Sequence, residues 1–302
     1  MDYFEKYKNY HAGYVTIIGR PNCGKSTLMN TLLDFKISIV TNKPQTTRQN
    51  ILGILSGDDY QIIFMDTPGL LLPRYKLHET MMTAARKAID DADLHLFMTE
   101  ADGKNKETDV SIFKKLNIDM SKAILLINKV DLVNKASVLP LIEYFHKTCK
   151  FREIFPVSAL NNEGLDDLVK NIVAELPQSP PFYPEDELST NPERFFVADI
   201  IREKIILNFS QEIPYSVTVH IEEFKEREKG KDFVQAAIFV ERPTQRRIII
   251  GKNGAALKRV GQQARDEIEK FLDREVFLKL WVGVRENWRE NKNLLKEFGY
   301  LE

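Results

Sequence analysis

The residues from Gly19 to Ser26 have the types and spacing needed to hold a chain of phosphates. Gly19, Gly24, Lys25 and Ser26 fit the pattern G-x-x-x-x-G-K-[ST], placed between an apolar run and a helical pattern as a phosphate-binding loop requires. Its glycines let backbone N–H groups converge on phosphates at the N-terminus of a helix. Lys25 would bring positive charge to the β- and γ-phosphates, and the Ser26 hydroxyl could bind magnesium. The other residues predicted to line the loop are Asn22, Cys23 and Thr27.

Two further segments are predicted to respond to the γ-phosphate. Asp66-Thr-Pro-Gly69 follows an apolar run, so Asp66 could reach magnesium through water and the Gly69 N–H could meet the γ-phosphate. The polar loop 41–48 could supply a threonine hydroxyl that binds the metal only while the γ-phosphate is present. We choose Thr47, with Thr46 as the alternative, and an ordinary solvated loop is the simpler interpretation. The predicted catalytic residues are Lys25, Thr47 and Gly69, and the predicted metal ligands are Ser26, Thr47 and Asp66.

The tetrapeptide Asn128-Lys-Val-Asp131 predicts which base is bound. Guanine presents an N1–H and an exocyclic amine side by side, so the Asp131 carboxylate can accept both hydrogen bonds, whereas adenine offers no such pair. Asn128 would join this loop to the phosphate loop, and the stem of Lys129 can lie over the purine ring. Ser158-Ala159 follows a later apolar run and would complete the wall, with the Ala159 N–H facing guanine O6. Together these residues predict a site for GTP rather than ATP.

The order of elements predicts an α/β domain followed by a second domain. Between 14 and 176, short apolar runs alternate with amphipathic stretches, as in a mostly parallel sheet with helices on both faces. Strands are predicted at 14–18, 51–55, 61–65, 94–98, 123–127 and 154–157, and helices at 25–33, 77–89, 110–116, 136–146 and 164–176. Prolines in 177–184 cannot continue a helix. The predicted division is therefore 1–176 for the nucleotide domain, 177–190 for a linker and 191–302 for the second domain.

The second half carries a basic stripe that predicts nucleic-acid binding. From Arg242 to Arg265 there are seven cationic side chains and no acidic one. Within it, Gly251-Lys-Asn-Gly254 precedes a helical pattern, as in the GXXG loop of a KH domain, which clamps single-stranded nucleic acid. The surrounding pattern predicts helix 191–208, strands 215–224 and 233–240, helix 255–272, strand 276–284 and a helical tail. That order favours an α+β KH domain of the prokaryotic type II.

Taken together, these motifs resemble the Era family of bacterial ribosome-assembly GTPases along essentially the whole chain. The matching segments are 19–26, 44–48, 66–69, 128–131 and 158–159 in the first half, and 183–186, 201–204, 214–219, 250–254 and 281–285 in the second. The resemblance implies Mg²⁺-dependent hydrolysis of GTP to GDP, binding to 16S ribosomal RNA near its 3′ end, and a role in assembly of the small (30S) ribosomal subunit. The RNA-binding residues that we predict are Arg246, Arg247, Ile250, Gly251, Lys252, Asn253, Gly254, Lys258 and Arg259.

Two positions bear on how hydrolysis would proceed. Leu70 follows Gly69 where Ras-type switches carry the glutamine that orients water, so turnover is expected to be slow; the family shares this substitution. Resemblance to cation-stimulated GTPases suggests that the Asn22 side chain helps to hold potassium, although Asn22 could equally just suit the turn. Cys23 is expected to serve as a small loop residue rather than a redox group.

A local conflict concerns 246–250, where isoleucines favour a strand while a KH domain requires a helix leading into the loop. We follow the family and expect a helix. Trp281 and Trp288 are expected to be packing residues rather than platforms for bases.

Composition limits the alternatives. The chain has 302 residues, 29% of them charged, a net charge of -1 and two cysteines, which favours a globular cytosolic protein without a disulfide framework. The N-terminus has no apolar run typical of a signal peptide or membrane span, and a peripheral membrane role would have only the basic stripe to rest on. The protein is expected to be a monomer. A P-loop kinase or ATPase is disfavoured by Asp131, and an RNA-binding module with a purely structural nucleotide site is the third possibility.

Overall fold

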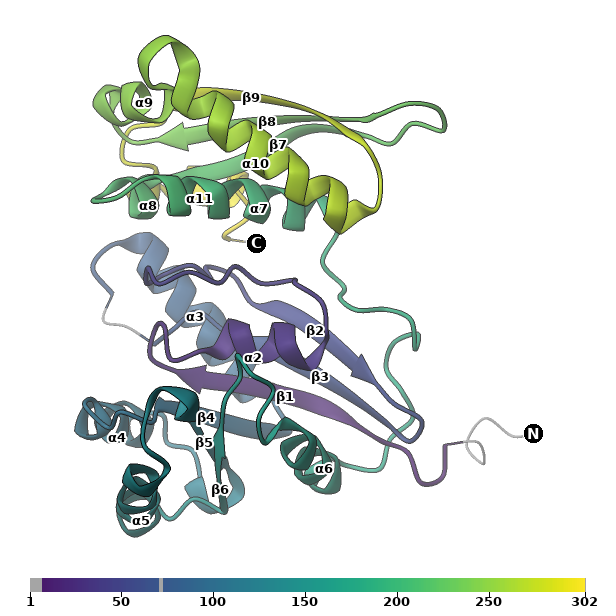
Figure 1. Cartoon of the computed structure of the whole chain (residues 1–302), viewed down its shortest axis with the longest axis vertical. Helices are drawn as coiled ribbons and strands as arrows, with labels where there is room; N and C mark the ends of the chain where they lie inside the picture. Colours follow the sequence, from purple (N-terminus) through teal and green to yellow (C-terminus); the bar gives the residue numbers. More distant parts are fainter. Residues whose placement is uncertain (1–6, 71–72, 302) are drawn as a thin grey trace. The chain divides into compact units, whose positions relative to one another are not determined.

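The computed structural model describes residues 7–70 and 73–301, which form two compact units (Figure 1). The first unit reaches to Ser38, resumes at Thr47 and, after a further break, continues from Met82 to Thr190. The second begins at Asn191 and also includes two short stretches of the first half, Ile39–Thr46 and Pro73–Met81. The division thus differs from a simple cut at 176, because the predicted linker groups with the first unit.

The segment 177–190 is bound to the edge of the first unit's sheet. The Leu188 carbonyl accepts a hydrogen bond from the Ile54 N–H at 2.9 Å, in an edge strand. The buried Gln61 side chain donates to the Tyr183 carbonyl at 2.9 Å and accepts from the N–H groups of Phe182 and Tyr183. The proline-rich composition correctly excludes a helix here, but these bonds hold the segment in place.

The first unit is a six-stranded sheet in the order β2-β3-β1-β4-β5-β6. Only β2 runs antiparallel to its neighbour, β3; the other pairs are parallel, as the sequence predicted. Parallel strands are buried on both faces, which explains the continuous apolar runs. The strands are β1 (His11–Gly19), β2 (Ile51–Ser56), β3 (Tyr60–Asp66), β4 (Leu94–Glu100), β5 (Ile124–Asn128) and β6 (Glu153–Val157).

Helices connect most of these strands along the chain. They are α2 (Lys25–Leu32), α3 (Lys76–Asp90), α4 (Lys106–Lys114), α5 (Val138–Cys149) and α6 (Leu165–Glu175), with 3-10 turns η1 (Met120–Lys122), η2 (Val130–Leu132) and η3 (Lys135–Ser137). The predicted helix 110–116 begins four residues earlier than expected. Its first turn carries Glu107 and Asp109, which favour the positive end of the helix dipole but add nothing to an apolar pattern.

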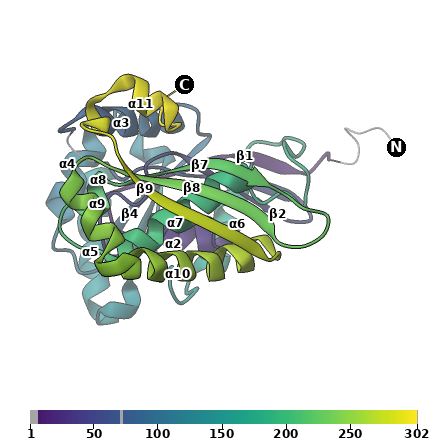
Figure 2. The same ribbon diagram turned by 90° about the horizontal axis from the view of Figure 1, so that it is seen from above.

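The second unit is a three-stranded sheet, order β7-β8-β9, with α7 and α10 along one side (Figures 1 and 2). Apolar side chains from both helices and all three strands form its core. This arrangement is the KH architecture that the element order predicted. Its elements are α7 (Glu193–Asn208), α8 (Ile213–Ser216), β7 (Thr218–Lys225), β8 (Asp232–Val240), α9 (Pro243–Ile250), η4 (Lys252–Gly254), α10 (Ala255–Leu272), β9 (Val276–Val284), η5 (Trp288–Glu290) and α11 (Lys292–Glu297).

Two short segments with local strand propensity are helical, one through tertiary packing and one because of a proline. The residues 246–250 are helical, as the KH domain requires. Pro243 begins α9, the Gln245 side chain accepts hydrogen bonds from the N–H groups of Glu241 and Arg242, and Ile249 is fully buried. The strand predicted at 215–224 is wrong at its start. Pro214 stands in the first turn of α8, so the chain forms a helical turn before β7 begins at Thr218.

The two tryptophans have different environments. Trp288 is fully buried and donates its Nε1–H to the Ser216 carbonyl at 2.8 Å, as expected of a packing residue. Trp281 is 37% exposed, donates to Glu222 and packs edge-on against Phe239. It makes the packing contact that was expected but is only partly covered. Side chains along β9 point alternately to the two faces of the sheet. Whether a given side chain is buried depends on which face the rest of the unit covers.

Candidate functional site

The phosphate loop is held by contacts with the loop that follows β5. Gly24 has φ +110°, and a Cβ there would lie 2.1 Å from Asn128 Nδ2, so only glycine fits without displacement. Asn128 Nδ2 donates to the Cys23 carbonyl at 2.9 Å. Lys25 is 6% exposed, and its Nζ donates to the carbonyls of Arg20 and Gly19 at 3.0 and 3.3 Å. Thr27 is half-buried in the first turn of α2. The lysine charge is therefore already inside the loop.

Three oxygen-bearing side chains converge beside this loop. Ser26 Oγ lies 2.7 Å from Asp66 Oδ2 and 3.1 Å from Thr47 Oγ1, and Thr47 Oγ1 lies 3.3 Å from Asp66 Oδ2. Asp66 is fully buried, and its Oδ1 has no hydrogen-bond partner among the residues that the structure describes. Burial raises the pKa of Asp66, against the opposing effects of the Lys25 charge and of hydrogen bonds from Ser26 and Thr47. A hard divalent cation would satisfy this set of oxygens.

The alternative threonine is used differently. Within the second unit, the carbonyl of Thr46 accepts a hydrogen bond from Arg202 Nη1 at 2.7 Å. Within 7–70 and 73–301, no group of three or more His, Cys, Asp or Glu side chains could hold a metal.

The loop after β3 packs directly on the phosphate loop. A Cβ at Gly69 would lie 2.7 Å from the backbone nitrogen of Pro21, and the Leu70 N–H donates to the Gly19 carbonyl at 3.3 Å. The Leu70 side chain packs against an apolar cluster of the first unit. It offers no polar group to a water molecule, in agreement with the interpretation of the sequence.

The expected base-binding residues come together in the loops that follow the carboxyl ends of β5 and β6. Ser158 Oγ donates to Asp131 Oδ1 at 2.6 Å, which orients that carboxylate. One prediction differs: the Ala159 N–H donates to Asn128 Oδ1 at 2.9 Å, rather than standing free to face guanine O6. The cause is that Asn128 uses both ends of its amide, joining the phosphate loop through Nδ2 and the Ser158-Ala159 loop through Oδ1.

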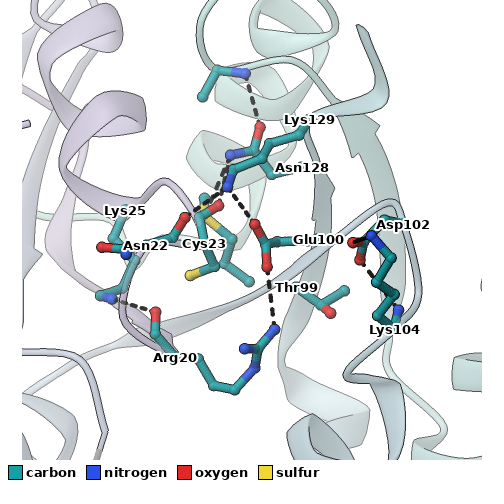
Figure 3. A network of polar contacts seen from close by, with 12 residues as sticks. Arg20, Asn22, Cys23, Lys25, Thr99, Glu100, Asp102, Lys104, Asn128 and Lys129 are labelled. Carbon is teal, nitrogen blue, oxygen red and sulfur yellow. Dashed lines mark hydrogen bonds and ion pairs between the residues drawn. The ribbon is translucent and has the colours of Figure 1, made fainter. Parts of the chain in front are cut away.

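Asn22 and Cys23 occupy the turn of the phosphate loop. Asn22 has φ +67°, and its carbonyl accepts a hydrogen bond from Lys129 Nζ at 2.8 Å (Figure 3). Cys23 is fully buried, and burial raises the pKa of its thiol. Because reactive thiols need a lowered pKa, Cys23 fits the role of a small packing residue.

Sequence reasoning missed a polar network beside these residues. Figure 3 shows Glu100 between Arg20 of the phosphate loop and Lys129 of the base loop. Arg20 occupies a variable position of the loop pattern, so the pattern gives no signal for it. Glu100 does carry one, because it is a polar residue at the carboxyl end of β4, the edge where open α/β sheets bind ligands.

The GXXG loop in the second unit joins α9 to α10. Gly251 and Gly254 have φ values of +72° and +77°, and the space around a Cβ at Gly254 is open to 4 Å. Arg246 Nε donates to the Val282 carbonyl at 3.0 Å, and Arg259 Nε to Asn208 Oδ1 at 2.8 Å. Ile250 packs on the core. The remaining predicted contacts are exposed: Arg247, Lys252, Asn253 and Lys258.

The family models match both units. A model described as 50S ribosome-binding GTPase matches residues 14–129, and one described as KH domain matches residues 212–289. No helix of the described residues is both long and apolar enough to cross a membrane.

Similar proteins match nearly the whole chain. GTPase Era of Ruminiclostridium cellulolyticum is 44% identical over 97% of this chain and 98% of its own length. GTPase Era of Geotalea uraniireducens is 47% identical, with 97% and 99% covered. Two solved structures each have a TM-score of 0.93 and 39% identity, and cover 97% of this chain and 100% of theirs. One is Aquifex aeolicus Era bound to GDP·AlF4⁻, and the other is Era with MgGDPNP and nucleotides 1506–1542 of 16S ribosomal RNA. Because relatives named GTPase Era are 44% and 47% identical over 97% of this chain, and family models match in both halves, the chain belongs to the Era family of GTPases.

Proposed function

We propose that the chain is a GTP-hydrolysing switch that binds 16S ribosomal RNA near its 3′ end and acts in assembly of the 30S subunit. The observation that carries the proposal is the likeness, over 97% of the chain, to an Era structure that holds MgGDPNP and a 16S segment together. The family description that mentions the 50S subunit applies to residues 14–129 alone. Such a role would be performed in the cytoplasm, where ribosomes are assembled.

In this proposal the first unit binds GTP through three groups of side chains. Lys25 and the backbone of the phosphate loop hold the β- and γ-phosphates. Asp131, oriented by Ser158, accepts the two guanine donors, while Asn128 keeps the base loop and phosphate loop at a fixed separation. Lys129 lies over the purine. Specificity for guanine then follows from a charged acceptor that adenine cannot match.

Ser26, Thr47 and Asp66 are the proposed magnesium ligands, with Asp66 acting directly or through water. When bound, Mg²⁺ would neutralise charge on the β- and γ-phosphate oxygens. Thr47 would tie its loop to the nucleotide, and the Gly69 N–H would donate to the γ-phosphate. The convergence of these three side chains supports this assignment. Among the described residues Asp66 Oδ1 also has no hydrogen-bond donor, and a bound cation would compensate this buried oxygen.

Water for hydrolysis must be oriented without a glutamine, since Leu70 packs into an apolar cluster. Backbone groups of the two loops around Thr47 and Gly69 are the proposed substitutes, and a slow intrinsic rate follows. Phosphate release under multiple turnover, measured with GTP and with ATP, tests the reaction and the base together. Comparable rates with both nucleotides, or a single turnover only, would exclude a GTPase switch.

Potassium is a separate proposal that rests on Asn22 at the turn of the loop. If its side chain helps to hold a monovalent cation, replacing sodium by potassium should raise the GTPase rate. Asn22→Ala should remove that difference while leaving GDP binding measurable. Equal rates of the unaltered protein in both salts would leave Asn22 with a turn role only.

RNA binding is assigned to the GXXG loop and the cations around it. An oligonucleotide with the 3′ sequence of 16S RNA should bind more tightly than a scrambled oligonucleotide of the same composition. The measurement is fluorescence anisotropy in excess GDPNP and in excess GDP, because a switch should bind RNA differently in the two states. Equal affinity for both oligonucleotides would contradict 16S recognition.

A further inference from the structure

Glu100 joins the two loops that would bind opposite ends of the nucleotide (Figure 3). It stands at the carboxyl end of β4, and its side chain is 22% exposed. Oε2 accepts a hydrogen bond from Arg20 Nη2 of the phosphate loop at 3.3 Å. Oε1 accepts one from Lys129 Nζ of the base loop. The carboxylate therefore pairs with one cation from each loop.

Arg20 is held independently from its other side. Its Nε donates to Asp109 Oδ1 at 2.5 Å, and Asp109 Oδ2 accepts from Thr99 Oγ1 at 2.6 Å. The Asp109 side chain is 1% exposed, so the pair with Arg20 is structural, and loss of either partner would leave a buried charge. Arg20 thus has an anchor on α4 that does not require Glu100.

Among the described residues, Lys129 pairs with one carboxylate, that of Glu100. Its Nζ contacts the Glu100 carboxylate and donates to the Asn22 carbonyl at 2.8 Å, and its side chain is 33% exposed. Lys129 also has φ +68°, a left-handed backbone conformation, and the bond to Asn22 brings its Nζ to the phosphate loop. The Lys129 side chain is flexible, so the acceptors that bind its Nζ hold it in one conformation.

We propose that Glu100 is a positioning residue for nucleotide binding, which holds the Lys129 stem in its course across the phosphate loop before the nucleotide arrives. The inference rests on the proposed guanine-nucleotide site. Its physical basis is preorganisation: an ordered stem loses less side-chain entropy on binding. Glu100 does not contact Ser26, Thr47 or Asp66, so its effect should be equal for GDP and GTP.

The test is the rate at which fluorescent GDP leaves Glu100→Gln. The amide keeps the shape but not the charge, and release should be about tenfold faster, as expected when a hydrogen bond to a charged group is weakened. The ratio of GTP to GDP affinity and the preference for guanine over xanthine should not change. Glu143→Gln is the matched control, because it breaks an exposed ion pair with Lys147 far along the chain.

A double-mutant cycle with Lys129→Met separates positioning from a general structural effect. In the Lys129→Met background, Glu100→Gln should add less than a twofold change in GDP release. An equal tenfold change in both backgrounds, or an unchanged rate in Glu100→Gln alone, would overturn the proposal. Asp109→Asn removes the buried partner of Arg20 and serves as an example of a variant that has lost structure. Its thermal unfolding without nucleotide is compared with that of Glu100→Gln. If the unaltered protein binds no guanine nucleotide, the proposed function fails instead.

Discussion

The nucleotide site and the GXXG loop are built in opposite ways. Asn128, Asp66 and Ser158 are 2%, 0% and 0% exposed, and each is joined to other site residues by hydrogen bonds. Lys252 and Lys258, by contrast, stand exposed around a loop whose shape comes from two glycines. One site is suited to recognition by fixed, directional bonds, and the other by backbone access and charge.

Their charge balance differs in the same way. Beside the nucleotide site, two cations face two anions in the network of Arg20, Lys129, Glu100 and Asp109. The stripe from Arg242 to Arg265 has cations only. We therefore expect nucleotide recognition to depend on geometry and to vary little with salt, and RNA binding to fall steeply as salt rises.

The largest effect should come from Gly24→Ala. The new Cβ would lie 2.1 Å from Asn128 Nδ2 on a backbone with φ +110°, so the joint between the two loops must open. Nucleotide affinity should fall by more than about 3 kcal/mol. Calorimetric titration with GDP measures it. Gly230→Ala is the control, since Gly230 also has positive φ but open space around it; equal affinity in the two variants would refute the steric argument.

Asp131→Asn should come next. The amide loses the charged acceptor for the guanine N1–H and amine but can donate to the carbonyl that xanthine carries in place of that amine. GTP binding should weaken by about 2 to 4 kcal/mol while a xanthine nucleotide gains. Competition between the two nucleotides gives the ratio. Unchanged GTP affinity would show that Asp131 does not select the base.

Gly254→Asp should separate the two regions. A carboxylate in the open space at Gly254 would repel the RNA backbone, which should lower RNA affinity by at least about 2 kcal/mol, while basal GTP hydrolysis persists. Gly254→Ala adds the Cβ without the charge and should bind RNA better than Gly254→Asp. Loss of GTPase activity in Gly254→Asp would mean that the two regions cannot be treated separately.

Lys252→Ala should have the smallest effect. Removing one phosphate contact should weaken binding to matched and scrambled strands alike and reduce the log–log salt slope by about 0.7. The measurement is RNA affinity at several salt concentrations. Parallel slopes for the variant and the unaltered protein would place the RNA surface elsewhere.

Local patterns explain which parts were predictable. The phosphate loop, the Asp66 and Asn128 segments and the Gly251 loop each combine a short motif with the element before and after it, and all lie where the motifs indicated. The start of α4 and the helical turn α8 were missed. The first depends on an acidic first turn and the second on a single proline, and a search for apolar periodicity detects neither.

The amino-acid sequence by itself determined the family, the fold of both halves and the residue types at the nucleotide site, because their motifs are continuous in the chain. Only tertiary structure decided how these segments join. The bond between Asn128 and the Cys23 carbonyl spans 105 positions, and the Arg20–Asp109 pair spans 89. A hydrogen bond between such distant residues depends on strand order and on the relative depth of neighbouring loops. For that reason the use of the Ala159 N–H by Asn128 and the bridge through Glu100 emerge only when the sheet has formed.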